Sequence, residues 1–145
     1  VYETEANLTM QAKEIRLGVS TTILQVLPAL GSSGGGERGT GELAEAIVEA
    51  GGRAIIASAG GRRVHELIRV GAKHVFIPLD SKNPVVMYNN IARLSALVLQ
   101  EGVNLIHARS RAPAWSAYFA AQRTHRPFVT TFNGVYNSDN FLKNN

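Results

Sequence analysis

Residues 23–58, ILQVLPALGSSGGGERGTGELAEAIVEAGGRAIIAS, decide the fold that this sequence predicts. The run ILQVLP is short, apolar and rich in β-branched residues, and Pro28 ends it, so a buried strand is predicted there. Apolar residues then recur at helical spacing through positions 43–50, and two glycines at 51 and 52 end that helix. The next apolar run, RAIIAS, predicts a second strand. A strand, a helix and a strand in this order predict two parallel strands joined by a crossover helix.

The same alternation continues through the rest of the chain. Further strands are predicted over HVFIPL (74–79), VNLIHARS (103–110) and RPFVTTF (126–132), and further helices over 62–72, 84–100 and 112–125. Five strands alternating with four helices predict an α/β fold, a Rossmann-like doubly wound parallel sheet of order 3-2-1-4-5. Residues 1–22 lack a clear period and are expected to be an N-terminal tail or a partial helix. Residues 23–145 are expected to form one Rossmann-like domain.

Composition excludes several classes of protein. The chain has 145 residues, 45% of them hydrophobic, which suits one globular domain with a buried core. Its net charge is +4 without a run of like charges, so nucleic acid is not an expected partner. It has no cysteine, which fits a reducing compartment. No apolar stretch is long enough to cross a bilayer, and the first residues do not resemble a signal peptide.

The two ends of the sequence predict a longer protein. The chain begins with Val1 rather than methionine and stops after the polar stretch NSDNFLKNN. We therefore expect a domain that is incomplete at its C-terminus, with the full-length protein continuing beyond Asn145.

Polar and glycine-rich segments follow the first, fourth and fifth predicted strands. They read PALGSSGGGER, HARSRAPAW and FNGVYN, whereas the turns at the opposite end of the strands are plain helix stops. Ligands of open α/β sheets bind beyond the carboxyl ends of the strands, where the strand order reverses. These three segments are therefore the candidate binding site.

The glycine-rich segment predicts a close approach of the backbone to an anion. Without a Cβ, Gly34, Gly35 and Gly36 would let amide groups approach a phosphate or a sugar hydroxyl at a helix N-terminus. Its spacing matches neither the dinucleotide fingerprint nor a P-loop. Glu37 suits the helix dipole whatever its function, whereas Arg38 there favours an anionic partner. A flexible turn is the alternative interpretation of the three glycines.

The segment HARSR predicts a site for an anionic group. His107, Arg109 and Arg111 alternate, so along a strand they would share one face. The planar fork of arginine suits phosphate. We predict that these three residues and Ser110 bind an acceptor. The alternative is a solvated strand end in which His107 is a satisfied structural residue.

The other candidate residues are expected to be structural. His65, His74 and His125 lack neighbours at ligand spacing, so no metal site is predicted. Trp115 and Tyr118 lie three apart on a helix, where core packing is expected, and stacking on a sugar is the alternative for Trp115.

Residues 23–58, followed by the segments HARSRAPAWSAYFAA and PFVTTFNGVYN, resemble the N-terminal domain of family 4 glycosyltransferases of the GT-B fold, in particular the bacterial lipopolysaccharide-type members. The resemblance covers residues 23–137. It implies two Rossmann-like domains around a cleft, with the acceptor held mainly by the N-terminal domain and a nucleotide-sugar by the C-terminal one. It also implies retaining transfer of a hexose without a metal ion.

The resemblance assigns roles to particular residues. In this family the glycine loop approaches the donor diphosphate, a role that maps onto Gly35 and Gly36, and we predict that Gly34 and Arg38 also contact the donor phosphate or sugar. The family often has histidine after the fifth strand, where this chain has Asn133 followed by Gly134. We predict that these two residues line the reacting centre. An amide cannot take up a proton near neutral pH, so a proton-accepting role is not carried over to Asn133.

These observations lead to three hypotheses on function, the last of which is a non-catalytic fragment stabilised by self-association. In the first, the chain is the acceptor-binding half of a glycosyltransferase that moves a sugar from a UDP- or GDP-sugar to a glycan or lipid-linked acceptor, and it is inactive alone. In the second, it is a free-standing Rossmann-like module that binds a nucleotide or an anionic sugar without catalysis. No further cofactor is expected. A role in cell-envelope synthesis implies a cytoplasmic location; peripheral association with the inner face of the inner membrane and a homodimer of the fragment stay open.

Overall fold

The computed structural model describes residues 21–31 and 35–131. Strands and helices alternate along them as the sequence predicts. In chain order they are β1 Thr22–Val26, α2 Gly35–Glu49, β2 Arg53–Ser58, α3 Val64–Arg69, β3 Lys73–Phe76, α4 Pro84–Glu101, β4 Leu105–Ala108, α5 Arg111–Thr124 and β5 Phe128–Thr130.

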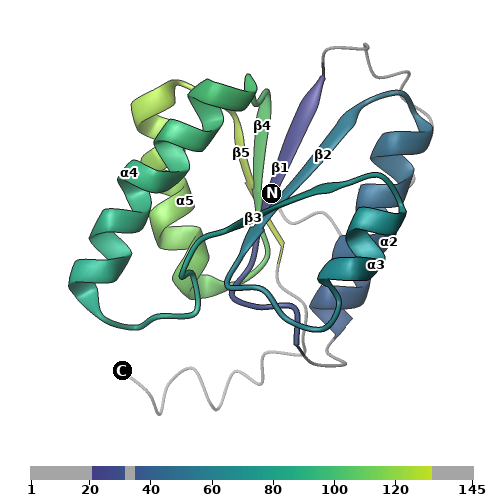
Figure 1. The fold of residues 1–145 in the computed structure, drawn as a ribbon. Coiled ribbons are helices and arrows are strands. Elements are labelled where there is room, and N and C mark those ends of the chain that lie inside the picture. The colour runs from purple at the N-terminus through teal and green to yellow at the C-terminus, as the bar shows by residue number, and fades with distance from the viewer. Residues whose placement is uncertain (1–20, 32–34, 132–145) are drawn as a thin grey trace, which may run out of the picture.

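The strands of the described residues form one parallel sheet in the order β3-β2-β1-β4-β5, which confirms the predicted topology. Leu24 of β1 lies opposite Ile55 of β2 on one side and Ile106 of β4 on the other. Helices α2 and α3 cover one face of the sheet, and α4 and α5 cover the other (Figure 1). The helices change face because right-handed crossovers build the sheet outward from β1 in both directions.

The sheet separates two apolar clusters because successive side chains of a strand point to opposite faces. Leu24 and Val26 belong to the cluster beneath α4 and α5, whereas Ala54 and Ile56 belong to the one beneath α2 and α3. Burial on both faces explains why each strand has a nearly continuous apolar sequence. Gln25, between Leu24 and Val26, is an exception to this apolar pattern, because it is polar and buried and its side chain points toward α2.

Capping residues set the bounds of α4. The Asn83 side chain accepts a hydrogen bond from the Val85 amide at 2.9 Å, and Pro84 occupies the first turn. Gly102 ends the helix with φ 63°, a left-handed conformation that glycine adopts without steric cost. These local signals are strong, so the helix matches its prediction within one residue.

Helix α5 differs from its prediction in the direction of its aromatic side chains. Trp115 and Tyr118 are each 44% exposed, so the expected core packing is wrong. Small residues on the inner face of the helix, including Ala117 and Ala120, are fully buried. They let α5 lie close to the sheet and leave no room there for large rings.

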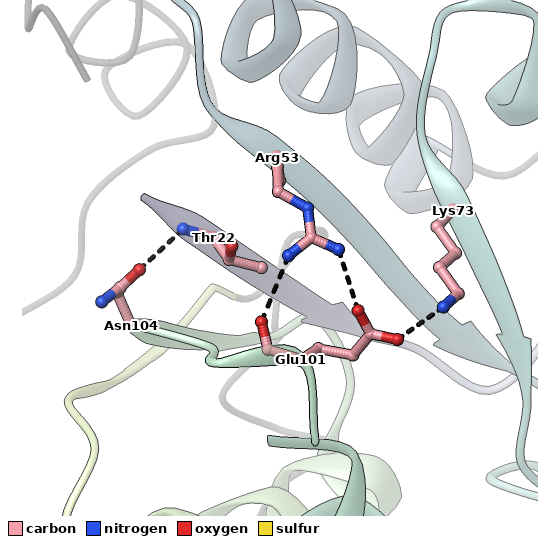
Figure 2. Close-up of polar contacts among 5 residues, drawn as sticks. All are labelled: Thr22, Arg53, Lys73, Glu101 and Asn104. Carbon is pink, nitrogen blue, oxygen red and sulfur yellow. Dashed lines mark hydrogen bonds and ion pairs between the residues drawn. The ribbon is translucent and has the colours of Figure 1, made fainter. Parts of the chain in front are cut away.

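An ion-pair network closes the amino-terminal edge of the sheet (Figure 2). Glu101, at the end of α4, pairs with Arg53 at 2.8 Å and with Lys73. Nearby, the Asn104 side chain accepts a hydrogen bond from the Thr22 amide at 2.7 Å. These contacts join the beginnings of β1, β2 and β3 to the end of α4 and the residue before β4.

Candidate functional site

The candidate site lies at the carboxyl edge of the sheet, between β1 and β4. The sheet order reverses there, since β1 leads outward to β2 on one side while β4 and β5 lie on the other. Because the strands are parallel, the ends of β1, β4 and β5 and the start of α2 meet at this one edge. Two of the three segments that the sequence singled out, PALGSSGGGER and HARSRAPAW, leave the sheet here, and FNGVYN lies outside the described residues.

The segment after β1 stays attached to the segment after β2. The Leu30 amide donates to the Gly60 carbonyl, and the Arg63 amide donates to the Leu30 carbonyl, each at 2.9 Å. Gly61 passes so close that a Cβ on it would lie 2.4 Å from the Leu30 carbonyl carbon. Residues 27–31, the stem of the glycine loop, are therefore held in place by backbone contacts.

The predicted glycines lie at the beginning of α2. Gly35 is its first residue and Gly36 its second, whereas Gly34 lies outside the described residues. Glu37 is in the first turn, where its charge suits the helix dipole. The exposed Arg38 pairs with Glu42 one turn along the helix at 3.1 Å. An exposed pair of this kind can exchange its partner for an anionic ligand at little cost.

Arg109 is buried beneath α2 rather than directed at the open edge. Arg109 is only 6% exposed, and its Nε donates a hydrogen bond to Gln25 Oε1 at 2.8 Å. Its Nη2 donates to the Gly39 carbonyl at 3.2 Å, and Gln25 Nε2 donates to the Thr40 carbonyl at 3.2 Å. Arg109 and Gln25 therefore connect β4 and β1 to the first turns of α2.

His107 lies beside Gln25 in the sheet and is also buried. The two residues are register partners in β4 and β1. His107 Nε2 is 2.8 Å from Thr131 Oγ1, which connects β4 to the residue after β5. Burial first, and then the charge of Arg109, lowers the pKa of His107 to about 3. The imidazole is therefore neutral near pH 7 and serves as a hydrogen-bonding group.

Ser110 and Arg111 lie at the surface end of this segment. Strand β4 ends at Ala108, and α5 begins at Arg111, with Ser110 at its N-cap position. The expected shared strand face for His107, Arg109 and Arg111 is therefore wrong. Arg111 is exposed, whereas the other two are buried, so the structure separates the predicted cluster into an inner pair and an outer residue.

The predicted reacting-centre residues Asn133 and Gly134 lie outside the described residues. The last described residue, Thr131, is hydrogen-bonded to His107 and therefore lies at the candidate site. Sequence reasoning missed Gln25 and Thr131. A signal for Gln25 was present, since it is the one amide in an otherwise apolar strand.

Hydrogen bonding and charge are the chemistry that the described part of this edge offers. Within residues 21–31 and 35–131, no group of three or more histidine, aspartate or glutamate residues could hold a metal ion. The amides at the start of α2 and the exposed Arg38 and Arg111 suit an anionic or polyhydroxyl ligand.

A doubly wound α/β fold with a glycine-rich helix start at its switch point defines a class of ligand-binding domains. Residues 33–144 match the family described as Glycosyltransferase Family 4. That match spans more than half of the chain, so the chain belongs to this family.

Solved structures agree with this assignment. A glycosyltransferase from Rickettsia africae ESF-5 is 42% identical, with a TM-score of 0.72, over 86% of this chain and 32% of that one. The chain thus spans about a third of that protein. The C-terminal domain of a hydrogenase from Pyrococcus furiosus, 14% identical with a TM-score of 0.59, covers 81% of this chain and 95% of its own, and shares the fold alone. A comparison with curated proteins finds no match.

Proposed function

We propose that this chain is the acceptor-side half of a GT-B glycosyltransferase of the lipopolysaccharide type, which transfers a hexose from a UDP- or GDP-sugar to a glycan or lipid-linked acceptor with retention and without a metal ion. The observation that carries the proposal is the meeting of the β1, β4 and β5 ends with the start of α2 at one edge. Membership of a glycosyltransferase family gives that edge its chemistry.

We assign the predicted residues different roles according to whether their side chains are exposed or buried. Gly34, Gly35 and Gly36 approach the donor phosphates through their amides, with Arg38 beside them. The exposed Arg111, next to Ser110, contacts the acceptor. The buried positions of Arg109 and His107 support a positioning role for both.

Asn133 and Gly134 are proposed to line the reacting centre. They follow Thr131 by two and three residues in the sequence, and Thr131 is bonded to β4 through His107. We propose a cytoplasmic location, where nucleotide-sugars are made. No helix among the described residues combines the length and apolarity that a membrane crossing requires.

The chain alone is expected to catalyse no transfer, because on this proposal it supplies one wall of a two-walled cleft. The test incubates the purified chain with UDP- and GDP-sugars and with candidate oligosaccharide acceptors, and follows products by mass spectrometry. In parallel, NMR titrations follow the backbone amides of Ser110 and Arg111 with each acceptor and each nucleotide.

The proposal predicts no turnover, acceptor-dependent shifts at Ser110 and Arg111, and no tight nucleotide binding. An Arg111→Ala variant should lose the acceptor shifts, whereas Arg69→Ala, at an exposed position at the end of α3 near the amino-terminal edge of the sheet, should keep them. Turnover by the chain alone would contradict the proposal that the chain supplies only one side of the catalytic cleft. Tight nucleotide binding that Gly35→Val abolishes, without any acceptor binding, would favour the free-standing binding module instead.

A further inference from the structure

Two consecutive arginines, Arg62 and Arg63, follow β2 at the carboxyl edge of the sheet. Strand β2 ends at Ser58 and α3 begins at Val64, so both arginines belong to the loop between them. Sequence reasoning did not single out this loop, because the segments that it selected follow β1, β4 and β5. The strands of the described residues are parallel, so the loop after β2 lies at the same edge as those segments.

Backbone contacts hold the two arginines beside the stem of the glycine loop. The Arg63 amide donates to the Leu30 carbonyl, and the Leu30 amide donates to the Gly60 carbonyl, each at 2.9 Å. Gly60 and Gly61 have φ values of 87° and 144°, which side chains other than glycine rarely adopt. The four residues from Gly31 to the start of α2 span at most about 14 Å. The arginines therefore lie near the helix start that the donor phosphates are proposed to approach.

Neither arginine has an acidic partner in the part of the chain that the structure describes. The ion pairs found there involve other residues, Arg38 with Glu42 and Glu101 with Arg53 and Lys73. Glu66, three residues after Arg63, is exposed and pairs with neither arginine. Arg62 is exposed and Arg63 is half-buried. Two consecutive positive charges without a counter-ion create a local positive potential that attracts an anion.

A further cation lies on the other side of β1. Strands β2 and β4 are the two neighbours of β1, so their ends are two strand spacings, about 10 Å, apart. The exposed Arg111 begins α5 three residues after the end of β4. Arg109, which the sequence spacing placed in one anion site with Arg111, is buried against Gln25 instead. The cations around the end of β1 are therefore Arg111 on one side and Arg62 and Arg63 on the other.

We propose that Arg62 and Arg63 form a subsite for an oxyanion group, a phosphate or a carboxylate, that the sugar acceptor carries. The planar guanidinium suits both groups, because it can donate two parallel hydrogen bonds to two oxygens. The acceptor then lies across the end of β1, with Ser110 and Arg111 on the β4 side and the arginine pair on the β2 side. A neutral sugar leaves the pair without a counter-ion, so the subsite selects anionic acceptors.

This inference rests on the proposed acceptor role of the chain and adds the class of acceptor. The test titrates the purified chain with glucose 6-phosphate, glucuronate, neutral glucose and inorganic phosphate. NMR follows the backbone amides of Gly61, Arg62, Arg63 and Ser110. We expect saturable shifts at all four positions with both anionic sugars and none with glucose at the same concentrations. Added salt should weaken the binding, because it screens the charges.

Matched variants separate the subsite from the general positive charge of the chain. Arg62→Gln/Arg63→Gln should weaken the binding of glucose 6-phosphate by about tenfold or more. Arg69→Gln/Arg123→Gln removes the same net charge at exposed positions in the last turns of α3 and α5, and should change binding by less than about twofold. Arg62→Lys/Arg63→Lys keeps the charge without the planar fork, so its affinity should lie between these two. Far-UV circular dichroism and urea unfolding identify any variant that fails to fold.

Several results would overturn the subsite. Equal shifts with glucose, no shifts with either anionic sugar, or equal weakening by the control pair would each exclude it. Inorganic phosphate that binds as tightly as glucose 6-phosphate, with no sugar-dependent shift at Ser110, would show an anion site that takes no acceptor.

The subsite and the proposed function fail in different ways. If shifts at Ser110 persist with unchanged affinity in Arg62→Gln/Arg63→Gln, the acceptor role of the chain stands and the arginine subsite is wrong. Turnover by the chain alone, by contrast, would contradict the proposed function and leave the shifts at Arg62 and Arg63 as they are.

Discussion

The guanidinium of Arg109 lies between two strands and the helix that covers them, where it donates to Gln25 and to the Gly39 carbonyl. A buried arginine is costly to desolvate, so it persists where its hydrogen bonds hold other groups in place. Here the groups are the central strand of the sheet and the first turns of α2. At the scale of single residues, Arg109 is therefore a support for the glycine-rich end of that helix.

Replacing Arg109 by methionine should lower the free energy of unfolding by about 2 kcal/mol, because Gln25 Oε1 stays buried without its donor. The double variant Arg109→Met/Gln25→Met should recover part of the loss, since it removes both polar partners. Urea unfolding measures both. Arg62→Met, at an exposed position, should change stability by less than about 0.5 kcal/mol. A single variant as stable as the wild type would show that Arg109 supports nothing.

His107 should make the protein less stable in mild acid. Its pKa is lowered to about 3 in the folded chain, against 6.5 when unfolded. The unfolded chain therefore binds a proton that the folded chain excludes between these values, and stability falls as pH falls through that window. From about pH 7 to about pH 5 the loss from this group is about 2 kcal/mol.

Urea unfolding at the two pH values checks this expectation. His107→Gln keeps a hydrogen-bonding amide near Thr131 but cannot titrate, so its stability should depend less on pH. Burial also lowers the pKa of His74, which contributes with the same sign and is retained in that variant. An identical pH dependence in the variant and the wild type would contradict the role given to His107.

Sequence reasoning found the polar residues of this region but not their depth. The spacing of His107, Arg109 and Arg111 predicts one shared face only if the strand continues through all three, and β4 ends at Ala108. Where a strand ends depends on its neighbours in the sheet, which spacing does not reveal. The partner of Arg109 is also 84 positions away in the sequence, at Gln25.

At the scale of elements, the decisive feature is the contact between the loops that follow β1 and β2. Strand pairing continues beyond the strands themselves through Leu27, Pro28 and Leu30, whose backbone groups bond to residues 57–63. Glycine at position 61 permits this close approach, with φ 144° and no side chain. Backbone hydrogen bonds thus fix the position of residues 27–30, which precede the glycine-rich segment.

Alanine at position 61 should be among the most costly small substitutions in the chain. Its Cβ would lie 2.4 Å from the Leu30 carbonyl carbon, and the backbone that it meets cannot move like a flexible side chain. We expect a loss of about 2–4 kcal/mol in the free energy of unfolding. Gly102→Ala is the matched control, because Gly102 also has a positive φ, 63°, but nothing within 4 Å of a Cβ. It should cost only about 1 kcal/mol, and equal costs for the two would contradict the close approach.

The elements themselves follow from local signals. Pro84, Gly51 and Gly102 begin or end helices where the sequence predicts, because each restricts or frees the backbone by its own covalent structure. The outward direction of Trp115 could not be predicted in this way. A hydrophobic stripe on a helix shows only that one face is buried, and α5 has alanines on one side and aromatics on the other.

At the scale of the whole molecule, the two edges of the sheet have different chemistry. The amino-terminal edge is closed by the network around Glu101 (Figure 2), whereas the carboxyl edge gathers the loops of the candidate site. The strand order could be predicted in full because alternating strands and helices with right-handed crossovers leave few arrangements.

Replacing Glu101 by glutamine should cost about 1 kcal/mol or less, since its two ion pairs are partly exposed. Hydrogen bonds from Lys73 and Arg53 lower the pKa of Glu101, so its contribution is present above the ordinary carboxylate pKa and is lost as pH falls below it. Urea unfolding with and without added salt measures the effect, which should shrink in salt. Glu45→Gln, at an exposed position in α2, is the control. A salt-independent loss would indicate packing rather than charge.

The polar groups beneath α2 have a consequence for motion. The layer formed by α4 and α5 covers an apolar cluster and has the neutral Asn90 and Ser116 as buried polar residues of its helices, while the layer formed by α2 and α3 shares its interior with Gln25, His107 and the charged Arg109. Water that enters beneath α2 meets groups it can solvate, so the penalty for briefly lifting that layer is smaller. Amide protons of α2 should therefore exchange with deuterium sooner than those of α5, because the layer that carries the glycine-rich helix start opens more often than the opposite layer.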